Sequence, residues 1–183
     1  MSYDFRLCLP QVGRSREEIA TADAEDRGIT DPVPAKEERK GRVSAALTAH
    51  NPALERFVFG FDKIAEFEKI SVDEAKKKHR HIELNGPEGG NGIQVMLFDD
   101  DASVTVPYWH HGAAARRVFE EIWSYFEIME REGGFFTYDP QIERVLDLKK
   151  EFEAALSCYD RASRRVAERL PARHKKRWWE FWK

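Results

Sequence analysis

Histidine and aspartate residues are the first candidates for chemistry in this chain of 183 residues. His79 and His81 begin a predicted strand, and a meander of strands would place them at the same sheet end as the turn Asp99–Asp101. Imidazole and carboxylate groups together bind transition metals. The cations Lys76–Lys78 and Arg80 occupy the same stretch and would repel a metal ion. We therefore expect a solvated, charge-balanced sheet end, with no metal and no cofactor.

The acidic turn formed by Asp99, Asp100 and Asp101 has two interpretations. Aspartate is favoured in turns because its side chain hydrogen-bonds to nearby backbone groups. Alternatively, the turn is an exposed acidic knob that docks on a basic partner, where it would raise the association rate and the specificity. We include all three residues among the candidate partner-binding residues.

A second group, Tyr108, Trp109, His110 and His111, follows a predicted strand. Tyrosine and tryptophan are enriched at interfaces, where they bury a large area. An aromatic lid on the sheet end is the structural alternative, and a pocket here would suit a small-molecule or nucleotide-processing enzyme. No nucleophile signature or isolated pair of acids accompanies the group. We therefore assign no catalytic residue, include these four residues among the candidate partner-binding residues, and expect a non-enzymatic protein.

The C-terminal residues Arg173–Lys183 form a basic aromatic tail, in which cations precede Trp178, Trp179, Phe181 and Trp182. Such a segment could bind an anionic membrane surface or stack on single-stranded nucleic acid. It could also bind a protein partner, fold back onto an apolar patch, or pair with a second copy of the chain. The three tryptophans are candidate partner-binding residues.

The overall composition excludes two classes of protein. Lys and Arg total 30 and Asp and Glu total 33, a net charge of −3, which argues against a dedicated nucleic-acid binder. The 42% of apolar residues is too high for a disordered chain. Cys8 and Cys158 have no metal or redox spacing, and no signal peptide or membrane-spanning run is visible. We expect a cytoplasmic protein without an integral membrane segment.

The spacing of apolar residues predicts an antiparallel sheet. Alternating runs separated by turn residues predict a three-stranded meander over His81–Leu84, Ile93–Phe98 and Ser103–Tyr108. One face of it is apolar, and the other is available to solvent or a partner. Pro107 either ends the third strand or places it at an edge. Further strands are expected near the N-terminus and over Phe57–Phe61 and Phe135–Tyr138.

Helical signals flank this sheet. Helices are expected over Val43–His50 and Gly112–Glu132, and Asp139-Pro140 carries the capping signature of a long final helix that reaches Leu170. Shorter helical turns are expected after Asp62 and after Ser71, which begins a capping box. The fold class is α+β, with the sheet packed against two long C-terminal helices.

A single domain is expected over residues 1–170, followed by the basic aromatic tail at 171–183. Residues 11–42 are rich in charge and carry few apolar side chains. We interpret them as a mobile insert that can contain a short helix over Ser15–Asp26, and such a long insert is either functional or disordered.

Several segments resemble a group of small, largely uncharacterised bacterial cytoplasmic proteins, some of which look like immunity proteins of polymorphic or contact-dependent toxin systems. The resemblance is carried by Met1–Asp4, Ala45–Glu55, Ile82–Asn85, Val104–Trp109 and Tyr138–Gln141. It implies a protein that neutralises a cognate toxin by direct binding. Immunity proteins share no active site, so the resemblance implies no catalytic residues.

Three functions are therefore weighed. The first is an immunity protein that binds a toxin. The others are an enzyme with a pocket near Trp109, His110 and His111, and a membrane or nucleic-acid adaptor acting through the tail. A homodimer is a further alternative for the assembly.

Overall fold

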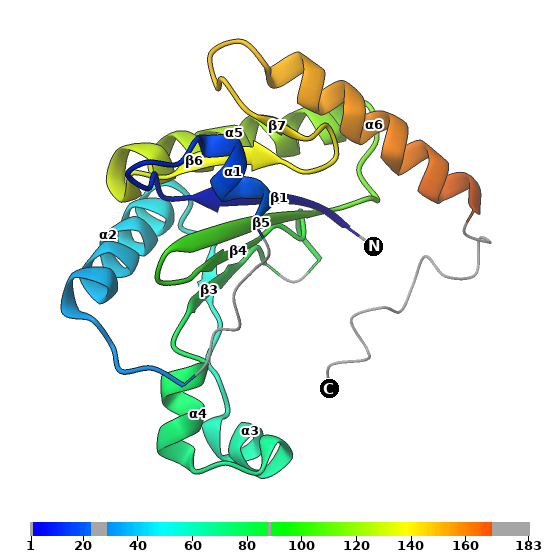
Figure 1. The fold of residues 1–183 in the computed structure, drawn as a ribbon. Helices are drawn as coiled ribbons and strands as arrows, with labels where there is room; N and C mark the ends of the chain where they lie inside the picture. Colours follow the sequence, from blue (N-terminus) through cyan, green and yellow to red (C-terminus); the bar gives the residue numbers. More distant parts are fainter. Residues whose placement is uncertain (1, 23–28, 88, 170–183) are drawn as a thin grey trace.

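The computed structural model describes residues 2–22, 29–87 and 89–169. Within them the chain forms six helices and one antiparallel sheet of seven strands (Figure 1). The predicted α+β class with an antiparallel sheet is confirmed. The residues of the basic aromatic tail, including Trp178, Trp179 and Trp182, lie outside the described residues.

The sheet has the strand order β2-β3-β4-β5-β1-β6-β7. The strands are β1 (Ser2–Cys8), β2 (Glu55–Arg56), β3 (Ile82–Asn85), β4 (Gln94–Leu97), β5 (Asp101–Pro107), β6 (Phe136–Asp139) and β7 (Arg144–Val145). The predicted meander is therefore β3-β4-β5. Pro107 ends β5 opposite Ser2, and because β1 pairs along it, β5 is a central strand.

Three helices cover one face of the sheet: α2 (Pro34–His50), α5 (Ala113–Gly133) and α6 (Phe152–Arg169). Alternate strand residues such as Tyr3 and Phe5 point into this layer, where the rings of Phe5 and Phe126 lie 4.9 Å apart. The apolar stripe of α5 is buried as its helical spacing predicts. Gly134 ends that helix in the left-handed conformation, as glycine allows.

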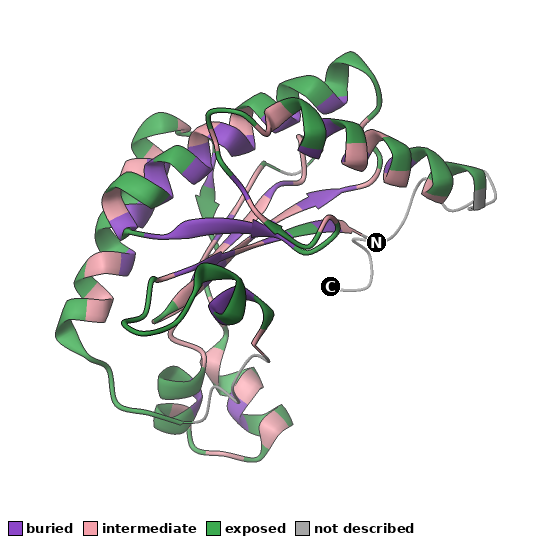
Figure 2. Ribbon diagram, turned by 45° about the horizontal axis from the view of Figure 1, so that its top comes forward, coloured by how far each residue is buried: buried purple, intermediate pink, exposed green. Residues whose placement is uncertain are grey.

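The opposite face is covered only at its β1–β6 end. There α1 (Arg16–Thr21), which begins with a capping box at Ser15, buries Ile19 and Ala20 against Cys8, Phe136 and Tyr138. No other described helix packs on this face (Figure 2). Within the described residues, most of the sheet is therefore covered on one side only.

The interpretation of residues 11–42 as a mobile insert is wrong for its second half. Pro34 begins α2, so residues 34–42 are helical and run on without a break to His50. Lys40 in this stretch is only 2% exposed. Its charge lies against the acidic turn at the end of β4, a pairing between residues about sixty positions apart that local composition does not show.

The strand expected over Phe57–Phe61 is also wrong. Only Glu55–Arg56 pair with β3, and one further hydrogen bond joins Phe57 N–H to Glu83 O at 2.9 Å. Gly60, rather than Asp62, begins α3 (Phe61–Glu68), which turns into α4 (Val72–Lys78). The capping box at Ser71 is confirmed. The α3–α4 hairpin projects beyond the end of the sheet (Figure 1).

The predicted helix from Pro140 to Leu170 forms only in its second half. Residues 140–143 make a turn in which Glu143 has φ 51°, and β7 then pairs back on β6. Asp139 caps no helix, because its buried carboxylate accepts hydrogen bonds from Tyr3 Oη at 2.6 Å and from Gln141 N–H at 2.9 Å. The helix α6 begins only at Phe152.

Candidate interaction surface

The uncovered part of the sheet, here called the open face, is the surface of β2–β5 and of the first half of β1 that points away from α2, α5 and α6. The register places its side chains in two rows across the strands. One row contains Asp4, Thr105, Gln94, Asn85 and Glu55, and the other contains Phe57, Glu83, Met96 and Ser103. The second row continues onto Arg6 of β1, whose guanidinium donates hydrogen bonds to Ala20 O and Ala22 O beside α1. Asp4, Glu55 and Phe57 are exposed and the remaining side chains are half-buried, whereas the alternate residues of the same strands are buried.

Three carboxylates, those of Asp4, Glu55 and Glu83, lie on the open face, and two of them accept side-chain hydrogen bonds from their neighbours. The Glu83 Oε1 atom accepts hydrogen bonds from Asn85 Nδ2 and Gln94 Nε2, each at 2.8 Å. Asp4 Oδ1 accepts from Thr105 Oγ1 at 2.8 Å. Among the described residues, no cationic side chain forms an ion pair with Asp4 or Glu83. Their negative charge is therefore oriented by neutral donors and remains available to a cationic ligand.

The β2 edge of the open face is apolar. Phe57 is 47% exposed, and its ring lies 5.0 Å from the ring of Phe59. Val58 and Phe67 are exposed by 85% and 88%, which is unusual for side chains of their size. These residues lie on the segment that follows β2 and on α3. An acidic plane therefore borders an apolar, aromatic rim.

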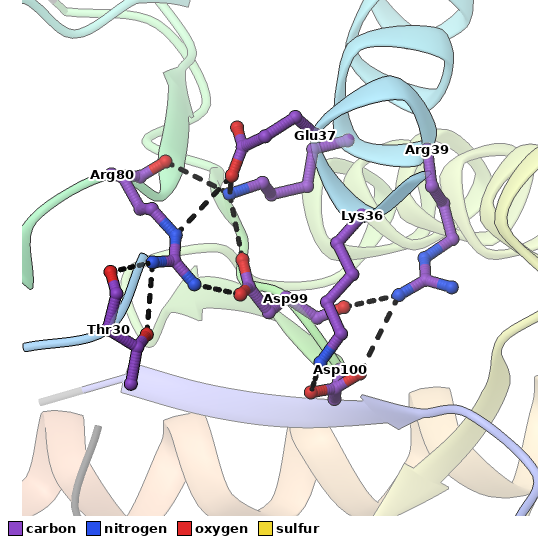
Figure 3. A network of polar contacts seen from close by, with 8 residues as sticks. Thr30, Lys36, Glu37, Arg39, Arg80, Asp99 and Asp100 are labelled. Atoms are coloured by element: carbon purple, nitrogen blue, oxygen red, sulfur yellow. Dashed lines mark hydrogen bonds and ion pairs between the residues drawn. The ribbon is translucent and has the colours of Figure 1, made fainter. Parts of the chain in front are cut away.

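The acidic turn lies at one end of this sheet and is already paired within the chain. Asp99 forms ion pairs with Arg80 and, at 3.0 Å, with Lys40 Nζ (Figure 3). Asp100 pairs with Lys36 at 2.5 Å and keeps 60% of its side chain exposed. Burial tends to raise the pKa of Asp99, but the hydrogen bonds from Arg80 and Lys40 hold it below its usual value.

The predicted acidic knob is thus partly neutralised. Asp99 is held inside a network with α2 and the α4–β3 connection, and Asp101 is the first residue of β5, opposite Cys8. The described ion pairs of this network involve three carboxylates, those of Glu37, Asp99 and Asp100. The side chain of Asp100 is the most exposed of the three. Whether the turn binds a partner stays a prediction.

The group Tyr108–His111 lies at the opposite end of β5. The ring of Tyr108 stacks on Tyr159 at 5.9 Å, and His110 Nε2 lies 2.6 Å from the backbone oxygen of Asn91. Burial lowers the pKa of His110. Trp109 lies over Gly92, where a Cβ would come within 2.5 Å of the indole ring. This packing is that of an aromatic lid on the sheet end.

The residues Tyr108–His111 therefore lie at the opposite end of the sheet from the acidic turn, and the two predicted groups do not form one site. His79 Nε2 lies 2.9 Å from Glu68 Oε1 on the α3–α4 hairpin. In the described ranges no group of three or more His, Cys, Asp or Glu side chains is arranged to hold a metal ion. Nor, among these residues, is any helix long and apolar enough to cross a lipid bilayer.

Sequence reasoning anticipated that one face of the meander would be available, but it did not select the residues of the open face. The alternation of Glu83, Gln94, Met96, Ser103 and Thr105 with buried neighbours is the signal that could have found them. The apolar rim was missed because Phe57 was assigned to a longer strand.

In comparisons with known proteins, no family model matches the chain, and no similar curated protein or solved structure was found. The resemblance to immunity proteins consequently stays a prediction. The functional argument rests on the geometry of the open face.

Proposed function

We propose that this chain is a non-enzymatic protein that binds a partner protein through its open face, in the manner of an immunity protein that neutralises a cognate toxin. The observation that carries the proposal is the one-sided cover of the sheet. The open face presents carboxylates without described ion pairs beside an apolar rim. Acidic planes with an apolar anchor suit protein recognition, because anchors supply affinity and charges supply orientation.

The size of the surface decides how much of it a partner must cover. The strands of the open face lie about 4.8 Å apart, and β3 and β4, with four residues each, are about 13 Å long, so the plane covers roughly 300 Å². A stable complex buries about 800 Å² on each partner. The rim with Phe57, Val58 and Phe67 must therefore contribute, which explains why large apolar side chains are exposed there.

The charge of the open face selects a basic partner. Asp4, Glu55 and Glu83 lie within two adjacent rows of the sheet. Enzymes that act on nucleic acids hold phosphates with Lys and Arg. A toxin of that class would expose a basic substrate site that this face could cover, and the charges would raise the association rate.

Catalysis is the weaker alternative for the same surface. Substrate sites are usually concave and combine an apolar pocket with a few convergent polar groups. The polar side chains of the open face instead bond to one another along a sheet, as Gln94 and Asn85 do with Glu83. A surface hollow lined by Ala46, His50, Ser124, Glu127, Ile128 and Arg131 lies among residues of α2 and α5, away from Trp109.

Co-expression with the product of the neighbouring gene tests the proposal. The wild-type chain is expected to relieve the toxicity of that product and to co-purify with it. Thr105→Arg and Glu83→Lys each place a cation on the open face and should weaken the complex at least about tenfold. The matched control is Glu127→Lys, an equal charge reversal at an exposed position of α5, which should bind as the wild type does. The proposal would be refuted if the product of the neighbouring gene is toxic but the chain neither binds it nor relieves its toxicity.

A further inference from the structure

The chain itself contains a segment with the chemistry that the open face requires. The basic aromatic tail carries the cations Arg173, Lys175, Lys176, Arg177 and Lys183 against one acid, Glu180. Three tryptophans and one phenylalanine accompany them. Cations complement Asp4 and Glu83, and the aromatic rings complement the apolar rim. The tail and the open face are therefore complementary both in charge and in apolar character.

The end of α6 places this segment near the open face. Tyr159 Oη donates to Pro107 O at 2.5 Å, and Ser163 Oγ lies 3.2 Å from His111 Nδ1, so α6 passes the end of β5. The N-terminus, and with it the start of β1, lies on the same side of the molecule as the end of α6 (Figure 1). Asp4 belongs to the row of the open face that is nearest to this end of the sheet. Measured along the strands, it is the carboxylate of the open face that lies closest to the end of α6.

The length of the chain after Arg169 is sufficient. The six residues from Ser163 to Arg169 carry α6 roughly 9 Å past the end of the sheet. Returning that distance and crossing one packed layer takes roughly 20 Å, which about six extended residues span. A chain of that length brings Lys175 and Lys176 within reach of Asp4. The remaining residues to Lys183 span roughly 23 Å, enough to cover the four interstrand spacings of about 4.8 Å between β1 and β2 and so to pass Met96 and arrive at Phe57.

We propose that residues 173–183 bind the open face of their own chain, with their cations on Asp4 and Glu83 and their aromatic rings on Met96 and the apolar rim. The tail then protects exposed apolar side chains while no partner is bound. The intramolecular contact itself does not depend on the proposed function.

Cross-linking of the full chain with a carbodiimide tests the contact, because this reagent joins a lysine amine to a carboxylate only when the two touch. We expect intrachain links from Lys175 or Lys176 to Asp4 or Glu83. The ion pairs Lys150–Asp147, at 2.8 Å, and Lys78–Glu68, at 3.0 Å, serve as internal positive controls. Met96→Arg should lower the yield of the tail links roughly tenfold, whereas Glu127→Lys should leave it unchanged.

A mixture of isotopically light and heavy chains separates intrachain from interchain links. Links between light and heavy chains would overturn the proposal in favour of a second copy as the occupant. Links from the tail to other surfaces, or no tail links while the internal controls react, would also overturn it. The wild-type map decides the question even if Met96→Arg fails to fold, and no partner protein is involved.

Discussion

At the scale of single residues, two lysines one turn apart on α2 differ in what their charges contribute. Lys40 is 2% exposed and contacts Glu37, Asp99 and the backbone oxygen of Arg80. Lys36 contacts Asp100 at the surface. Breaking a buried pair leaves a charge without its partner and costs several kcal/mol, whereas an exposed pair contributes little.

We therefore predict that Lys40→Met lowers the free energy of unfolding by about 3 kcal/mol. Lys36→Met should lower it by less than about 1 kcal/mol. Both variants keep most of the side-chain stem, so the comparison isolates the charge. Urea denaturation measures both values, and equal losses would contradict the assignment of Lys40 as the buried member of the network.

Asp139 gives a prediction about pH. Burial raises the pKa of its carboxyl above the ordinary value of 3.8, although hydrogen bonds from Tyr3 and from the backbone lower it in part. A raised folded-state pKa means that the folded protein binds this proton more tightly than the unfolded chain does. The contribution of Asp139 to stability therefore increases as the pH falls through the folded-state pKa.

The measurable form is the difference in unfolding free energy between the wild type and Asp139→Asn. That difference should shift in favour of the wild type as the pH is lowered from about 7 to about 4. Other carboxylates, such as Asp99 with its lowered pKa, change stability in the opposite direction but cancel in the difference. A difference that does not change with pH would show that Asp139 has the same pKa in both states.

At the scale of elements, the strands of the meander and the helix α5 were predictable because their burial alternates with the period of their own backbone. The open side of the meander followed from the same alternation. Residues 34–42 were not predictable, since the charges of Lys36 and Lys40 are compensated by Asp99 and Asp100 in a distant turn. From composition alone, a charged helix cannot be distinguished from a mobile insert, because the residues that pair with its charges are distant in the sequence.

The prediction that a helix begins directly after β6 was wrong for a related reason. Asp139-Pro140 has the local signature of a helix start, but Tyr3 on β1 uses the carboxylate of Asp139. The backbone then pairs as β7, with Leu146 N–H donating to Thr137 O at 2.9 Å. Tertiary hydrogen bonds thus overrode a local capping preference. The apolar rim was missed similarly, because the composition of Phe57–Phe61 predicted a strand, whereas β2 ends at Arg56.

Gly41 tests whether α2 is a helix in solution from its first turns onward. It is exposed inside the helix, and a Cβ there would meet no atom within 4 Å. Gly41→Ala should raise the free energy of unfolding by about 1 kcal/mol, because alanine loses less conformational freedom in a helix. Gly134→Ala, at φ 75°, should have the opposite effect. No gain at Gly41 would favour the mobile insert over the helix.

At the scale of the whole molecule, stability is not expected to be uniform. The core lies between the sheet and α2, α5 and α6, whereas the α3–α4 hairpin buries only Ala65 and Ala75 from its helices. Polar contacts connect the hairpin end to the body: Arg80 bonds to Asp99 and, at 2.7 Å, to Thr30 O. A unit with few buried contacts opens without global unfolding.

Hydrogen exchange followed by mass spectrometry should show this opening directly. Amides of α3 and α4 are expected to exchange at a free energy well below that of α5, whose inner face is buried. Arg80→Met should accelerate exchange in α3 and α4 at least about tenfold more than in α5, because it releases the hairpin from Asp99 and Thr30. Arg116→Met, which removes an exposed pair with Glu153 between α5 and α6, is the matched control and should leave hairpin exchange unchanged. Equal acceleration of α3, α4 and α5 by Arg80→Met would instead mean that the hairpin unfolds only together with the core, in which case Phe67, the member of the apolar rim that lies on α3, would be held as rigidly as the sheet.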